Sequence, residues 1–253
     1  MTEHPILEFD PDTSAILNPH PNMIKNLPTS GVLCFFQDVL EKLVGNGVLT
    51  EIGELGSEIG RNPVYKITYQ EKEFFVAHPG VGAPLSGGFL EELIASGGQA
   101  FIACGGCGVL DKKIVAGHPV ILTAAVRDEG TSYHYLPPSR EVTPHMEGIK
   151  VLEEAFQSAG LPFHLGKAWT TDGLYRETVK KRELRLAEGC EVVEMEASAF
   201  FAVAQFRKVK FGQVVYGGDL VVPEGWDSRR WNSRGSVREE LFWLALDACS
   251  RYQ

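Results

Sequence analysis

The chain has little of what membrane spans, secreted scaffolds and nucleic-acid surfaces require. No apolar run reaches the roughly 18 residues of a membrane-spanning helix, and the opening MTEHPILEFD lacks the basic and apolar parts of a signal peptide. The formal net charge is -9 and no run is rich in lysine and arginine, so we expect neither nucleic acid nor a membrane as partner. These absences predict a cytoplasmic protein.

Cysteine is also scarce. The five cysteines are too few and too widely spaced for the disulfide framework of a secreted protein. Cys104 and Cys107 form a C-x-x-C, which could be a redox pair or half of a zinc site. Because the sequence offers no second ligand pair, we expect no metal and interpret CGGC mainly as a glycine-rich turn.

What the chain does have is an alternation of short β-branched runs with segments of helical period. We expect strands at 31–36, 63–70, 72–79, 100–105, 119–126, 163–171, 190–195 and 211–218, and helices at 37–46, 87–96, 144–159, 175–187, 195–207 and 233–250.

This alternation predicts an α/β fold, in which a mixed, largely parallel and twisted β-sheet is flanked by helices on both faces. The stretch QEKE should turn a hairpin between two early strands. No linker-like tract divides the chain, so we expect a single domain over residues 1–253. Ligands of such sheets bind beyond the carboxyl ends of the strands.

Two glycine-rich turns follow expected strands. In AHPGVGAPLSGG, Gly80 and Gly82 would let backbone N–H groups approach an anion, although a plain tight turn is an equal alternative. The second turn, ACGGCGVL, spans residues 103–110. Two such turns on adjacent parallel strands would place two stretches of backbone without side chains along one crevice.

Three further segments carry polar side chains near strand ends. In AWTTDGLYRET, Trp169, Leu174 and Tyr175 could wall a flat ligand to which the polar residues of this stretch, Arg176 and Glu177 among them, present polar groups. Alternatively, Asp172 caps a helix whose solvated face carries Arg176 and Glu177. In YGGDLVVP, Asp219 is either a turn residue or a proton donor. The polar, aromatic stretch 222–235 is typical of a mobile loop or lid, or of a subunit contact.

The segment EVVEMEASAFFAVAQF places Glu194 and Glu196 in a run that is otherwise suited to burial. A carboxylate rarely enters a core without a partner, because its loss of water costs several kcal/mol. We therefore expect a polar partner at this point.

Taken in order, these segments resemble the nucleoside phosphorylase-I family, which comprises the purine nucleoside and uridine phosphorylases and their nucleosidase relatives. The matches are GVG-P-S near Gly80, GGCG at 105–108, VRDEGTSYHY at 126–135, TTDGLYRE at 170–177, VVEMEASA at 192–199 and GGDL at 217–220. VEMEA is specific, and RDEGTS and YRE are closer to the uridine phosphorylases. The resemblance implies the family's fold.

The resemblance also implies roles for sugar-binding and catalytic residues. Glu196 would bind the ribose 2′- and 3′-hydroxyls, which offer one carboxylate two charge-assisted hydrogen bonds. Met195 would pack against the sugar beside Glu194, and His4 would reach the 5′-hydroxyl of a ligand in a neighbouring subunit. Asp219 would be the general acid for the departing base.

The remaining implied contacts concern the base and phosphate. The base would contact Cys107, Gly108, Leu174, Tyr175 and Arg176, and phosphate would contact Gly80, Gly106 and, across a subunit boundary, Arg61.

The chain also departs from the family. Its phosphorylases carry P-G-D-P-x-R after the first strand, where this chain reads GVLCFFQDVL, and a second phosphate arginine is replaced by Ala103. Water is therefore an alternative nucleophile.

We expect an enzyme, a pentosyltransferase that cleaves the N-glycosidic bond of a ribonucleoside of the uridine or purine class. Phosphate would be the co-substrate, without metal or organic cofactor. The alternatives are a nucleoside hydrolase and a nucleoside-binding protein that has lost turnover. If sites are shared, the protein is a homo-oligomer, either a dimer or a hexamer built from dimers.

Overall fold

The computed structural model describes residues 4–21 and 23–253. Its strands are β1 (Ser30–Cys34), β2 (Thr50–Leu55), β3 (Asn62–Tyr69), β4 (Lys72–Ala77), β5 (Ala100–Val109), β6 (Pro119–Asp128), β7 (Glu141–Val142), β8 (His164–Thr171), β9 (Cys190–Glu194), β10 (Lys210–Val222) and β11 (Gly225–Asp227). Its α-helices are α1 (Gln37–Gly45), α2 (Ala83–Ala95), α3 (Met146–Ala159), α4 (Val179–Ala187), α5 (Ala197–Arg207) and α6 (Gly235–Ser250).

The sheet runs in the order β11-β10-β6-β8-β9-β5-β1-β4-β3-β2, and β10 also pairs with β5. Strands β5, β10, β6, β8 and β9 therefore form a closed ring. The sheet is mixed, as expected, but it is less parallel than expected. Closure of the ring requires antiparallel pairs between β10 and β6 and between β5 and β9.

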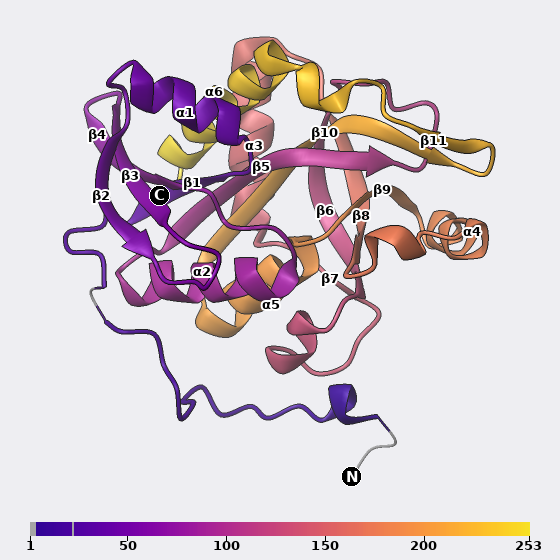
Figure 1. Ribbon diagram of the computed structural model, residues 1–253, viewed down its shortest axis with the longest axis horizontal. Helices are drawn as coiled ribbons and strands as arrows, with labels where there is room; N and C mark the ends of the chain where they lie inside the picture. Colours follow the sequence, from indigo (N-terminus) through magenta and orange to yellow (C-terminus); the bar gives the residue numbers. More distant parts are fainter. Residues whose placement is uncertain (1–3, 22) are drawn as a thin grey trace.

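Helices cover both faces of the sheet, as predicted: α1, α3 and α6 lie on one side and α2 and α5 on the other (Figure 1). Helix α5 packs deepest, because its first eight residues are all buried. Phe200 of α5 stacks on Phe211 of β10 with ring centroids 4.9 Å apart. This packing fixes the N-terminus of α5 beside the strand ends, where Glu194 and Glu196 lie.

Several element boundaries differ from the expectations. Helix α2 begins at Ala83 rather than at residue 87, because Pro84 suits a first helical turn. Helix α4 begins at Val179, because Thr178 caps it by accepting a hydrogen bond from the Lys181 N–H. Strands β2, β7 and β11 were not expected; β7 and β11 are very short, and β2 lies at the sheet edge.

The expected hairpin joins β3 to β4, and both of its turn residues, Gln70 and Glu71, have positive φ angles. Among the described residues, no helix is both long and apolar enough to cross a bilayer.

Candidate active site

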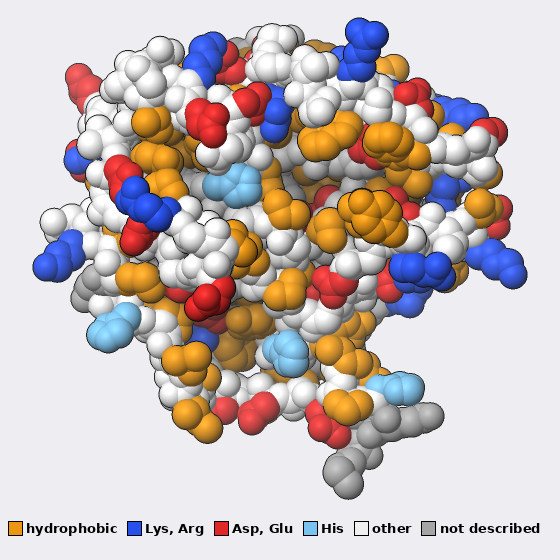
Figure 2. All heavy atoms as spheres, in the orientation of Figure 1, with side chains coloured by type: hydrophobic (Ala, Val, Ile, Leu, Met, Phe, Trp, Pro, Cys, Tyr) orange, Lys and Arg blue, Asp and Glu red, His pale blue; other side chains and the backbone are white. Residues whose placement is uncertain are grey.

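A cavity of about 820 Å³ opens at the strand ends beside the N-terminus of α5. Strands β1, β5 and β10 are parallel to one another, so their carboxyl ends meet at one edge of the sheet. Figure 2 shows apolar and acidic side chains gathered around a hollow on this face. The cavity is lined by Phe35, Phe36, Val81, Gly105, Gly106, Cys107, Gly108, Leu174, Tyr175, Glu177, Val193, Glu194, Met195, Glu196, Gln213, Val215, Asp219, Val221, Trp226, Trp231 and Arg238.

Glu194 ends β9 and holds the first turn of α5. One carboxylate oxygen accepts a hydrogen bond from the Thr170 hydroxyl at 2.5 Å. The other accepts the backbone N–H groups of Glu196 at 2.7 Å and Ala197 at 2.6 Å. These N–H groups lack helical partners, so the carboxylate caps the helix at its positive end. The partner expected for this buried carboxylate is thus supplied by the protein itself.

Glu196 faces the cavity from the N-cap position of α5. Its Oε1 accepts a hydrogen bond from the Gly82 N–H at 2.6 Å. Gly82 has a φ of +88°, a region that favours glycine. The glycine-rich turn therefore approaches the carboxylate of Glu196, and this contact leaves acceptor capacity on Glu196 for a ligand.

Burial raises the pKa of both Glu194 and Glu196 above the ordinary carboxyl range. For Glu196, repulsion from the Glu194 carboxylate adds to the effect of burial on the pKa. An ionised Glu196 is thus costly, and a ligand that donates hydrogen bonds to it would offset that cost.

Asp219 lies on β10, where the pairing register with β5 shifts between Gly217 and Leu220. Its Oδ2 accepts a hydrogen bond from the Trp226 indole N–H at 2.6 Å. Trp226 belongs to β11, so the polar, aromatic stretch expected as a lid forms a short hairpin and a wall of the cavity. The indole orients one oxygen of Asp219 and leaves the other available.

Glu177 is a further carboxyl group on the cavity wall, beside Leu174 and Tyr175. Burial, with a smaller contribution from the charge of Asp219, raises the pKa of Glu177 to about 7. The sequence allowed Glu177 a place either among the ligand-facing polar groups or on a solvated helix face. Glu177 in fact precedes α4, and its side chain lines the cavity.

The end of the cavity near β1 is aromatic rather than basic. Phe36 and Gly106 line it, and Arg238 of α6 is the one Lys, Arg or His side chain that lines the cavity within residues 4–21 and 23–253. The Arg238 guanidinium lies 4.9 Å from the centre of the Phe36 ring and pairs with Asp38 at 2.8 Å. Its Nε has no hydrogen-bond partner in the described structure.

Four of the predicted site residues do not line the cavity within this subunit. The Gly80 N–H donates to Nδ1 of His78. Arg61 is exposed and pairs with glutamates of β2. His4 lies in the N-terminal segment, and Arg176 is exposed on the 3-10 turn before α4. The other predicted residues, namely Gly106, Cys107, Gly108, Leu174, Tyr175, Glu194, Met195, Glu196 and Asp219, are brought together.

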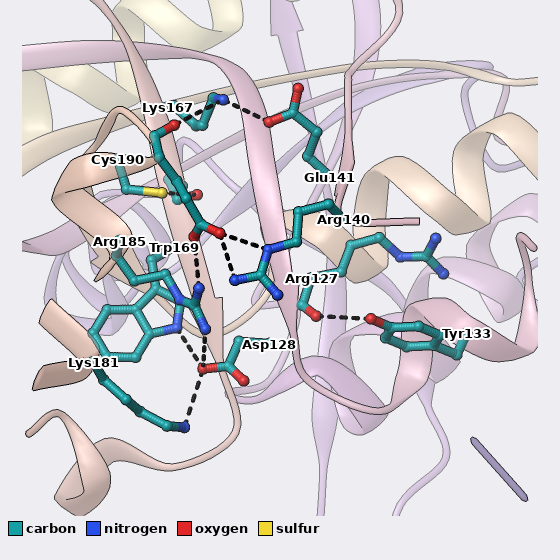
Figure 3. A network of polar contacts seen from close by, with 12 residues as sticks. Arg127, Asp128, Tyr133, Arg140, Glu141, Lys167, Trp169, Lys181, Arg185 and Cys190 are labelled. Atoms are coloured by element: carbon teal, nitrogen blue, oxygen red, sulfur yellow. Dashed lines mark hydrogen bonds and ion pairs between the residues drawn. The ribbon is translucent and has the colours of Figure 1, made fainter. Parts of the chain in front are cut away.

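A polar cluster anchors α4 and thereby the cavity wall that precedes it (Figure 3). Asp128, at the end of β6, accepts a hydrogen bond from the Trp169 indole at 2.9 Å. It also pairs with Lys181 at 3.1 Å and with Arg185 at 3.3 Å, both from α4. The guanidinium of Arg185 lies 5.6 Å from the centre of the Trp169 ring.

Sequence reasoning missed several cavity residues because they come from distant segments. Arg238 is contributed by α6 and Gln213 by the first half of β10, and no local motif marks either residue. The described part of the chain contains no group of three or more His, Cys, Asp or Glu side chains arranged to hold a metal ion.

Known proteins resemble this chain in both sequence and structure. A family model described as the phosphorylase superfamily matches residues 29–235. A guanosine phosphorylase of Halorubrum lacusprofundi is 28% identical over 167 residues, which cover 64% of this chain and 69% of that protein. A uridine phosphorylase of Treponema pallidum is 30% identical over 173 residues, which cover 62% of this chain and 67% of that protein.

Solved structures show the same fold. A purine nucleoside phosphorylase of Toxoplasma gondii in complex with immucillin-H superposes with a TM-score of 0.76 at 20% identity, covering 93% of this chain and 97% of that chain. An AMP nucleosidase of Bacteroides thetaiotaomicron gives a TM-score of 0.71 at 22% identity, with coverages of 90% and 89%.

Proposed function

Because the chain belongs to the phosphorylase superfamily, we propose that it is a pentosyltransferase that cleaves the N-glycosidic bond of a ribonucleoside with phosphate as nucleophile. One observation supports this most directly: a single cavity holds the buried carboxylate of Glu196 and, on another wall, the carboxyl group of Asp219. The carboxylate of Glu196 suits a sugar with adjacent hydroxyls, and the carboxyl group of Asp219 suits a departing base.

In the proposed complex, the free acceptor sites of Glu196 receive the ribose 2′- and 3′-hydroxyls. Each hydroxyl donates to a carboxylate oxygen, and such charge-assisted bonds compensate for the burial of the charge. Met195 packs against the sugar. Glu194 is a positioning residue, because both of its oxygens are occupied by Thr170 and by the α5 backbone.

Bond cleavage needs help at the base. A phosphate oxygen forms a bond to C1′ while the C1′–N bond breaks, and the electron pair of that bond goes to the base nitrogen. The sugar acquires oxocarbenium character and the base becomes anionic. Asp219 hydrogen-bonds or protonates the departing base, which lowers the barrier. The Trp226 indole holds Asp219 in place for this step.

Phosphate is proposed to bind near Gly106 and the glycine turn at Gly80, with Arg61 donated by a neighbouring subunit. In the described subunit Arg61 is exposed, and exposed ion pairs contribute little to stability, so it can exchange its glutamate partners for a ligand. Such sharing requires a homo-oligomer, either a dimer or a hexamer built from dimers. No metal or organic cofactor enters the proposed reaction.

One observation favours hydrolysis as a second candidate. Arg238, the cation that lines the described cavity, already pairs with Asp38, whereas a phosphate dianion is best held by several charge-assisted donors. Water carries no net charge and needs no such donors. A nucleoside hydrolase would use Glu196 and Asp219 in the same way.

The five cysteines all lie in the described part of the chain and are buried and free. We propose the cytoplasmic location expected from the sequence, in which five cysteines are too few and too widely spaced for a disulfide framework. We also propose that residues 1–253 form a single domain.

The test is a product assay on the purified full chain. Guanosine, inosine, adenosine and uridine are incubated with and without phosphate, and the free base is quantified by chromatography. Phosphate-dependent release supports phosphorolysis, and release without phosphate supports hydrolysis. Binding of nucleosides without any release would leave only a nucleoside-binding protein.

A further inference from the structure

His78 connects two segments of the cavity wall, although it is not one of the residues that line the cavity. It directly follows β4 and is half-buried. Its ring packs against the ring of Phe35 with centroids 5.8 Å apart, and Phe35 lines the cavity just after β1. In addition, Nδ1 of His78 accepts a hydrogen bond from the Gly80 N–H at 3.1 Å. One side chain therefore contacts both the loop after β1 and the glycine-rich turn.

The glycine-rich turn is held at Gly80 through both of its backbone polar groups. The Gly80 N–H donates to His78, and the Gly80 carbonyl accepts a hydrogen bond from the hydroxyl of the fully buried Ser86 at 3.2 Å. Gly80 has a φ of +76°, so the chain turns sharply there. Two residues later, the Gly82 N–H donates to Oε1 of Glu196 at 2.6 Å. The path of the turn thus decides where this donor meets the carboxylate.

The contact between His78 and Gly80 requires an imidazole whose Nδ1 carries no proton, because a protonated ring nitrogen is a donor. Burial lowers the pKa of His78, and an interaction with the Phe35 backbone opposes this effect to a smaller extent. The ring is therefore neutral at neutral pH. Neutrality keeps Nδ1 available as an acceptor for the Gly80 N–H.

We propose that His78 is a positioning residue for sugar recognition, which holds the glycine-rich turn so that the Gly82 N–H meets the Glu196 carboxylate. This inference rests on the proposed function, since it names the support of the group that binds the ribose hydroxyls. Burial raises the pKa of Glu196, and the Gly82 N–H acts against that rise. A displaced turn would leave Glu196 less ionised and less well oriented toward two hydroxyls.

The experiment uses two variants of the full chain that separate the acceptor of His78 from its ring. His78→Asn keeps an acceptor, because Oδ1 of asparagine is bonded to Cγ, as Nδ1 of histidine is, and can accept the N–H two residues later. His78→Phe keeps a ring beside Phe35 and removes the acceptor. Calorimetry measures the affinity for guanosine, inosine and uridine, each with its 2′-deoxy counterpart.

We expect the wild type to prefer the ribonucleosides. His78→Phe should reduce this preference by about 3- to 10-fold, the range expected for one lost hydrogen bond, and His78→Asn should retain it. If His78→Phe does not fold, Ser86→Ala, which removes the bond to the Gly80 carbonyl, should give the same selective loss. In a Glu196→Gln background, His78→Phe should not change the ribose preference further, because the two residues act through one contact.

An equal loss of affinity for both sugars in His78→Phe, or equal effects of His78→Phe and His78→Asn, would overturn the inference and indicate that the ring only packs. A ribose preference that His78→Phe leaves unchanged would also overturn it, and cleavage of nucleosides by that variant would leave the proposed function intact. If no nucleoside is cleaved, the proposed function fails, but a ribose preference in binding that depends on His78 still supports its positioning role.

Discussion

At the scale of single residues, the cavity concentrates carboxyl groups at a cost to stability. Glu194 recovers much of that cost through three hydrogen bonds from protein donors, whereas Glu196 receives one backbone N–H. Glu194 fixes the helix end, whereas Glu196 keeps acceptor capacity that we propose the sugar uses.

Glu196→Gln tests the sugar contact. Glutamine can still accept the Gly82 N–H but cannot accept two hydroxyls with full charge. We expect ribonucleosides to lose about 1.5–3 kcal/mol of binding, and 2′-deoxynucleosides to lose much less. Calorimetry or KM values for paired ribo- and deoxynucleosides measure the difference. Equal losses for both sugars would show that Glu196 does not contact the 2′-hydroxyl.

Asp219→Asn tests the leaving-group contact. With a purine nucleoside we expect turnover to fall by roughly 100-fold or more, the usual range for removal of a proton donor. The loss should shrink for a nitrophenyl riboside, whose leaving group departs without a proton. Asp227→Asn, an exposed neighbour on β11, should leave turnover unchanged. A uniform loss across leaving groups would mark Asp219 as a structural residue.

How far single residues could be predicted depended on local patterns. Glu194 and Glu196 stand out because charged side chains interrupt an apolar run, and Asp219 follows a glycine pair. Arg238 lies on the last helix, and its contact with Phe36 is set by the packing of α6 near α1. A contact of that kind depends on tertiary structure and leaves no mark in the local sequence.

At the scale of elements, α4 is held by charge rather than by an apolar face. Of its residues, only Arg185 is buried, and that guanidinium contacts Asp128 and Trp169. The helix therefore depends on the polar cluster at the end of β6. The segment before it carries Leu174, Tyr175 and Glu177, so the cluster also positions one wall of the cavity.

Asp128→Ala should weaken this anchor. It removes the carboxylate that faces Lys181, Arg185 and the Trp169 indole, and it leaves buried donors with fewer partners. We expect a loss of about 1–3 kcal/mol in the free energy of unfolding, together with faster hydrogen exchange in α4. Denaturant unfolding and exchange mass spectrometry measure both effects. Glu183→Ala on the exposed face is the control, and an equal change there would contradict the anchor.

Long, periodic segments could be predicted at this scale, and short or edge elements could not. Strands β1, β3 and β4 and helices α1 and α3 appear within a few residues of the expected positions. Strand β7 has two residues and β11 three, too few to show an alternation. Closure of the ring was also missed, because it depends on which strands pair over long distances.

At the scale of the whole molecule, several carboxyl groups have raised pKa values in the folded state. Burial is the main cause for Glu177, Glu194 and Glu196 alike. Such groups bind protons more tightly in the folded than in the unfolded chain. The stability they contribute is present below the ordinary carboxyl range and is lost as pH rises through their folded pKa values.

We therefore expect the ligand-free protein to become less stable between about pH 5 and pH 8. Glu196→Gln should flatten this dependence and raise the Tm at pH 8 by a few degrees, since about 1 kcal/mol shifts the Tm of a chain of this size by roughly 2–4 °C. Thermal unfolding at several pH values measures the effect. A Tm that rises over this range in the wild type, or a variant with unchanged dependence, would contradict the account of the buried carboxyl groups.

Assembly gives a second prediction for the whole molecule. If Arg61 completes a neighbour's site, Arg61→Ala and Asp219→Asn should each be nearly inactive. After subunit exchange, an equal mixture should recover about a quarter of the wild-type activity, because half of the dimers are hybrids with one intact site. Sedimentation shows whether dimers or hexamers form. An active monomer, or a mixture that recovers nothing, would exclude shared sites.

The central claim is that phosphate attacks C1′ of a bound ribonucleoside. The most direct measurement is a reaction in ¹⁸O-labelled water with unlabelled phosphate, followed by mass spectrometry of the sugar product. Phosphorolysis predicts ribose 1-phosphate whose C1′ oxygen carries no label. Hydrolysis would instead give free ribose, and would do so even when phosphate is omitted. If the reaction is quenched before the anomeric hydroxyl exchanges with solvent, this ribose carries the label at C1′. That result would contradict the claim and identify water as the nucleophile.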